Sequence, residues 1–153
     1  MAPSFRPVRP KCFFLAITLA WAVAIFLSSA LVALAGLSPL AAGKGLPHAT
    51  WMVADEVGPA AKLAFVLILA PLLFASVTRL RGAAALAAEI ASGCAAMLLT
   101  LVLLPESWSR GFGIGLSATR LDPALAAIYL ASAAVAAVAF HFSLAKCRRT
   151  LVP

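Results

Sequence analysis

Residues 82–104 (GAAALAAEIASGCAAMLLTLVLL) form an almost entirely apolar run with a single charged side chain, Glu89. An α-helix rises about 1.5 Å per residue, so roughly 20 apolar residues cross the ~30 Å hydrocarbon core of a bilayer. The run is long enough to do so. It therefore predicts a transmembrane helix.

The two faces of this predicted helix differ in side-chain size. Positions three and four residues apart share a face in a helix, which groups Glu89 with small or weakly polar neighbours: Ala85, Ser92, Gly93 and Ala96, with Thr100 close by. The opposite face is bulky: Leu98, Leu101 and Val102. Small faces pack against other helices in membranes, so we expect the Glu89 face to be buried and the leucine face to meet lipid.

The whole chain follows the same pattern. Hydrophobic residues make up 64% of its 153 residues and charged residues only 11%, with a mean hydropathy of +1.07, outside the range of soluble domains. The sequence predicts an all-α integral membrane bundle, a single domain over 1–153. Its four expected transmembrane helices span about 12–37, 59–78, 83–104 and 123–145.

Basic residues predict the orientation of these helices. A basic N-terminal arm (1–11), the 79–81 turn and a basic tail (146–153) contain eight of the twelve Lys and Arg residues and no acid. The positive-inside rule places these segments in the cytoplasm, and the loops 38–58 and 105–122 outside. We expect both termini to be cytoplasmic in a multi-pass protein of a bacterial inner membrane. The lipid bilayer is then its first partner. The net charge of +7 reflects these clusters, which argues against a nucleic-acid partner.

The first apolar run has an alternative interpretation. A basic start and the Ala33–Ala35 segment resemble a cleavable signal peptide. Its apolar core exceeds the roughly 7–15 residues of a signal peptide, which favours a retained helix.

Three residues are candidates for a functional role within the membrane. Glu89 lies about 12 Å past Arg81, and an intramembrane acid marks either an ion path or a helix-packing contact. His141 lies in the same half of the membrane on an alanine-lined face, where it could contact Glu89. The sequence slightly favours the alternative that His141 reaches the interface alone. Pro71, near the centre of the second helix, predicts a kink.

Cofactor and metal sites are not expected. The three cysteines have no C-x-x-C spacing, so Cys12 and Cys147, expected at one membrane face, are interpreted as reduced thiols rather than as a metal site, a lipid attachment site or a disulfide. His48 is expected on the opposite side from His141, which excludes haem held by both. The glycine-rich 111–115 segment lacks the strand and helix of a phosphate-binding loop and is interpreted as a turn.

These observations favour a non-catalytic protein, because serine–histidine pairs, paired acids and metal-ligand clusters are missing from the sequence. The leading hypothesis is an accessory, assembly or regulatory subunit of a larger membrane complex. The alternative is a small transporter or channel that acts as a homo-oligomer, with Glu89 lining the path and Pro71 aiding its opening.

Overall fold

The computed structural model describes residues 9–103 and 123–150, and within these ranges every regular element is a helix. Four helices are long and apolar enough to cross a membrane: α1 (Pro10–Leu34), α3 (Pro59–Arg79), α4 (Gly82–Leu103) and α5 (Pro123–Thr150). This architecture confirms the predicted four-helix bundle and is that of a multi-pass membrane protein. Two short helices connect α1 to α3: the 3₁₀-helix η1 (Pro39–Ala41) and α2 (Leu46–Glu56).

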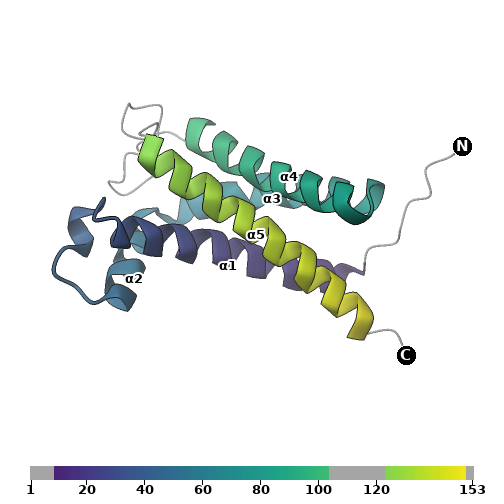
Figure 1. Ribbon diagram of the computed structural model, residues 1–153, viewed down its shortest axis with the longest axis horizontal. Coiled ribbons are helices and arrows are strands. Elements are labelled where there is room, and N and C mark those ends of the chain that lie inside the picture. The colour runs from purple at the N-terminus through teal and green to yellow at the C-terminus, as the bar shows by residue number, and fades with distance from the viewer. Residues whose placement is uncertain (1–8, 104–122, 151–153) are drawn as a thin grey trace, which may run out of the picture.

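The four long helices alternate in direction along the bundle (Figure 1). The start of α1 and the end of α5 lie at one end, and α2 lies at the other. Helix α5 packs along both α1 and α4, while α3 packs mainly against α4. The two termini of the described chain therefore share one end of the bundle, as the sequence predicted, with α5 as the central element.

The core follows from small residues at helical spacing. On α1, Cys12, Ala16, Ala20 and Ala24 recur every four residues and are at most 1% exposed. Side chains this small let neighbouring helices approach closely. Larger residues of the same core, such as Phe140 of α5 and Leu69 of α3, fill the remaining space. Large apolar side chains such as Leu67 and Phe14 point outward instead, as expected of a surface that faces lipid.

The segment 38–58 differs from its predicted loop. Glycines and prolines suggested irregular structure, but here they flank a helix: Gly45 is the N-cap residue of α2 and Pro47 lies in its first turn, where proline costs no hydrogen bond. Buried residues of α2, including Ala49 and Val53, pack in a cluster with Val32 of α1. These glycines and prolines therefore lie at the ends of a helix and do not indicate a loop throughout.

The ends of the outer helices also differ from the prediction. Helix α1 begins at Pro10 and ends at Leu34, before the glycine at position 36, which adopts a positive φ of 67° that favours glycine. Helix α5 continues through Lys146 to Thr150, because no residue in this part of the predicted tail interrupts the helix. The basic side chains Arg148 and Arg149 lie in its last turn, where cations interact favourably with the helix dipole.

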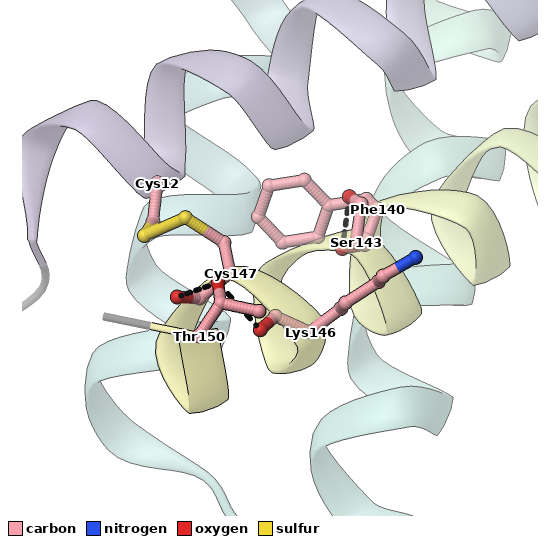
Figure 2. The surroundings of a disulfide bond; sticks show 6 residues. All are labelled: Cys12, Phe140, Ser143, Lys146, Cys147 and Thr150. Carbon is pink, nitrogen blue, oxygen red and sulfur yellow. Dashed lines mark hydrogen bonds between the residues drawn. A yellow bond between two sulfur atoms is a disulfide. The ribbon is translucent and has the colours of Figure 1, made fainter. Parts of the chain in front are cut away.

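The interpretation of Cys12 and Cys147 as reduced thiols is wrong for this structure, because the two residues form a disulfide. Figure 2 shows the bond joining α1 to α5, with the Phe140 ring beside it between the two helices. The odd number of cysteines argued against a disulfide, and so the pairing was not predicted. Spacing along the chain carries no signal for a bond between residues 135 positions apart.

Candidate functional site: a buried glutamate–histidine pair

Glu89 of α4 and His141 of α5 meet at the interface of these two helices. A hydrogen bond of 2.7 Å joins His141 Nδ1 and Glu89 Oε2. The Glu89 side chain is 3% exposed and that of His141 is 28% exposed. The sequence had slightly favoured a solitary His141, and the structure corrects this. Depth and small neighbours suggested that the contact was possible, but only the packing of α5 on α4 brings the two groups together.

The close approach of α4 and α5 depends on Gly93. A methyl group added there would lie 2.8 Å from the backbone oxygen of Ala133 and 3.3 Å from the side chain of Ala137. The first distance is too short for a real contact, so only glycine permits this packing. The Glu89 face of α4 is buried as predicted at Ala85, Glu89, Gly93, Ala96 and Thr100, whereas Ser92 on the same face is half-buried.

The opposite face of α4 agrees with the prediction in part. Leu98 and Val102 are exposed, but Leu101 is buried. Leu101 belongs to the main core cluster. The predicted lipid-facing stripe is therefore narrower than the sequence indicated.

A cavity of about 90 Å³ adjoins the pair at the end of the bundle that holds the termini. Its lining includes two charged side chains besides Glu89: Arg81 in the α3–α4 turn and Arg148 in the last turn of α5. The Arg148 guanidinium also acts electrostatically on the Glu89 carboxylate. The imidazole and the guanidinium charge thus offset part of the cost of burying the Glu89 carboxyl group.

This arrangement can do two things chemically. A carboxylate that accepts a hydrogen bond from an imidazole fixes two helices at one register, because removing either partner leaves a buried polar group unsatisfied. The same pair can also hold and transfer a proton, since the carboxyl and imidazole groups both titrate. The described residues that line the cavity include no serine or cysteine.

Two further polar contacts between helices were not identified from the sequence. The hydroxyl groups of Ser76 and Ser92 lie 3.2 Å apart and link α3 to α4. The indole Nε1 of Trp21 donates a 3.0 Å hydrogen bond to the backbone oxygen of Lys62, linking α1 to α3. Ser92 shares the face of Glu89, which was a usable signal. Trp21 gave none, because its acceptor is a backbone atom.

The remaining candidate residues lie apart from the pair. Pro71 is inside α3, which is helical on both sides of it. The kink stays a prediction. His48 is in α2, at the opposite end of the bundle from the end of α5 that carries His141 (Figure 1).

Other predicted features contribute no site within the described chain. Cys94 is a free cysteine whose Sγ donates a weak 3.8 Å hydrogen bond to the Leu130 backbone oxygen. The 111–115 turn lies outside the described residues. Within 9–103 and 123–150, no group of three or more His, Cys, Asp or Glu side chains could hold a metal ion.

Comparison of the chain with protein-family models, with curated proteins and with solved structures found no match.

Proposed function

We propose that this protein is a non-catalytic accessory, assembly or regulatory subunit of a larger complex in a bacterial inner membrane, with both termini cytoplasmic. The observation that carries the proposal is the use of the intramembrane Glu89–His141 pair. Glu89 and His141 bind each other inside the interface between α4 and α5. A pair of side chains held in this way fixes α4 against α5 within the bundle.

Several other polar groups of the spans support the same function. Ser76, Ser92 and Trp21 connect helices within the chain. Thr100 and Ser132 donate hydrogen bonds to backbone oxygens of their own helices. A bundle whose polarity serves its own packing offers an apolar exterior, on which a membrane partner can dock by van der Waals contact.

The small-residue face of α4 is less available to a partner protein than the sequence suggested. That face packs on α5 within the chain, at Gly93 and Ala96. A partner would therefore meet the large outward side chains, which include Leu67 of α3 and Phe142 of α5. This favours a surface formed by leucine and phenylalanine over one based on close backbone contact.

The alternative function is a homo-oligomeric transporter or channel. The cavity of about 90 Å³ beside Glu89 and His141 favours it, because a path through the membrane would need a polar opening at this end. Several copies would have to assemble to complete such a path, since one chain of four spans buries its polar groups.

Purification of the full-length tagged protein in a mild detergent separates the two functions. An accessory subunit should elute with a different, larger membrane protein in fixed proportion. A transporter or channel should elute as a homo-oligomer of this chain alone. Recovery of a monomer without partners, from membranes crosslinked before extraction, would contradict both.

Variants of Glu89 test the role of the pair in the same experiment. Glu89→Gln retains shape and hydrogen bonding and should preserve abundance and partner recovery, whereas Glu89→Leu leaves His141 without its acceptor and should lower both. In the transporter function, Glu89→Gln should abolish proton flux in proteoliposomes at unchanged abundance. An abundant Glu89→Leu protein with normal partner recovery and flux would show that neither role applies.

A further inference from the structure

The disulfide between Cys12 and Cys147 joins the first turn of α1 to the last turn of α5. Its two sulfur-bearing residues differ in accessibility. Cys12 is fully buried, whereas Cys147 is half-buried. Figure 2 shows Cys147 near the end of α5 and Cys12 on the α1 side, beside the Phe140 ring. A reagent from outside the bundle therefore reaches the Cys147 sulfur first.

Basic residues surround this end of the bundle. Lys11 lies next to Cys12 in sequence, and Lys146, Arg148 and Arg149 flank Cys147. Lys146 is exposed, and its side chain points away from the disulfide (Figure 2). A cluster of positive charge raises the local concentration of anions. Small thiols that carry carboxylates are therefore attracted to the more accessible sulfur.

The disulfide is also coupled to the glutamate–histidine pair through α5. Leu144, Ala145 and Arg148 lie within three residues of Cys147 and line the cavity beside Glu89 and His141. The end of α5 is thus held twice, to α1 by the disulfide and to α4 by the His141 hydrogen bond. Opening the disulfide would remove the covalent link and leave the noncovalent packing of α5 on α1 and α4.

We propose that Cys147 is a thiol–disulfide exchange site for a small anionic thiol of the glutathione class, with Cys12 as its buried partner. The attacking thiolate forms a bond to Cys147 Sγ and the Cys147–Cys12 bond breaks, so that Cys12 leaves as a thiolate and takes up a proton. A second thiol then attacks the small-molecule sulfur of this mixed disulfide. This step releases Cys147 as a thiol and joins the two small-molecule thiols in a disulfide.

The predicted orientation would expose this exchange site to the thiols of the cytoplasm. The basic end is the predicted cytoplasmic end, and disulfides in cytoplasmic environments are usually transient because the thiol pool reduces them. Reduction removes the covalent restraint between α1 and the last turn of α5, whose residues Leu144, Ala145 and Arg148 line the Glu89–His141 cavity. The thiol state of the compartment would then control the end of the bundle that carries the intramembrane pair.

Single-cysteine variants in mild detergent test which sulfur reacts. In a Cys94→Ala background, Cys12→Ser leaves Cys147 alone and Cys147→Ser leaves Cys12 alone. With glutathione disulfide, the Cys12→Ser protein should gain one glutathionyl adduct by intact mass, at least about tenfold faster than the Cys147→Ser protein, because access controls the rate of exchange. In denaturing detergent the two rates should converge. Equal rates in the folded state would refute the assignment.

The wild-type protein tests the exchange without any variant. Membranes are treated with reduced glutathione, quenched with acid and alkylated with a polyethylene-glycol maleimide, so that each free thiol retards the band on a gel. The folded protein should gain two reactive thiols and lose them again on addition of glutathione disulfide. If excess glutathione opens the disulfide only after the protein is unfolded, the bond is a permanent cross-link and the proposal is wrong. This measurement uses the wild-type protein, so it decides the question even if a variant fails to accumulate.

Discussion

Glu89 and Glu56 lie in different parts of the bundle, and only Glu89 has a side-chain hydrogen bond among the described residues. Glu89 is satisfied by His141. Glu56, in the last turn of α2, has its Oε2 atom buried without a hydrogen-bond partner among the described residues. Burial raises the pKa of Glu56 above its ordinary value. The fold therefore favours the protonated form of this carboxyl.

A pH dependence of stability follows from Glu56. An acid whose pKa is higher in the folded state binds more protons there than in the unfolded state, so its contribution is greatest at low pH and is lost as the pH rises through the raised pKa. Glu56→Gln removes this titration. The melting temperature of Glu56→Gln in detergent should therefore exceed that of the wild type increasingly as the pH rises from acidic to neutral.

Asp55 provides the control for this measurement. It is the adjacent acid in α2 and is exposed, so Asp55→Asn should leave the pH profile of the melting temperature close to that of the wild type. Parallel profiles for Glu56→Gln and the wild type would contradict the role assigned to burial at Glu56.

At the scale of the elements, the close packing of α4 against α5 depends on one residue, Gly93. Gly93 lets the backbone of α5 approach α4, and Glu89 lies one turn before it on the same face. A side chain at Gly93 would force a shift at this backbone contact, so we expect the helices to separate and the hydrogen bond to His141 to lengthen. Close packing and the polar contact are thus two consequences of one glycine.

Gly93→Ala tests this dependence. Alanine favours a helix over glycine by up to about 1 kcal/mol, but overpacking against a backbone atom costs typically about 1–3 kcal/mol. The steric cost should win, so Gly93→Ala should lower the melting temperature, and Gly93→Val should lower it further. Ala91→Val, at an exposed position of the same helix, should have a much smaller effect. Equal losses at both positions would show that the α4–α5 contact tolerates separation.

The sequence predicted some elements well and others not at all, for physical reasons. Helices α3, α4 and α5 begin within one residue of their predicted starts, because Pro59 and Pro123 mark first turns and the Arg79–Arg81 turn is short. Helix α2 was missed because a short surface helix lacks a long apolar run. The contact between Glu89 and His141 was left open, since periodicity gives the face of each helix but not which faces meet.

At the scale of the whole molecule, the disulfide closes nearly the entire chain into a loop. A loop of this length would stabilise a soluble protein by up to roughly 5 kcal/mol through the entropy of its unfolded state. Helices already inserted in a bilayer have far less freedom to lose, so we expect a smaller contribution here. This favours a role for the bond in holding the end of α5 over one in global stability.

The packing of α1 bears on whether the first helix is retained. Cys12, Ala16 and Ala20 lie in the main core against α5, and Cys12 forms the disulfide. Removing residues 1–35 as a signal peptide would expose the matching face of α5 and leave Cys147 without its partner. We therefore expect the first helix to be retained, and the intact mass of the membrane protein tests this prediction.

The orientation of the bundle can be tested through its two ends. The arm, the 79–81 turn and the tail contain eight of the twelve basic residues, and the structure places the beginning of α1 and the end of α5 at one end of the bundle, with α2 at the other (Figure 1). Reporter fusions after Arg81 and after Pro153 should therefore read cytoplasmic, and one near Gly45 should read external. An external reading for the Pro153 fusion would invert the bundle. It would also place the Cys12–Cys147 bond on the oxidising side of the membrane, where a disulfide persists without exchange.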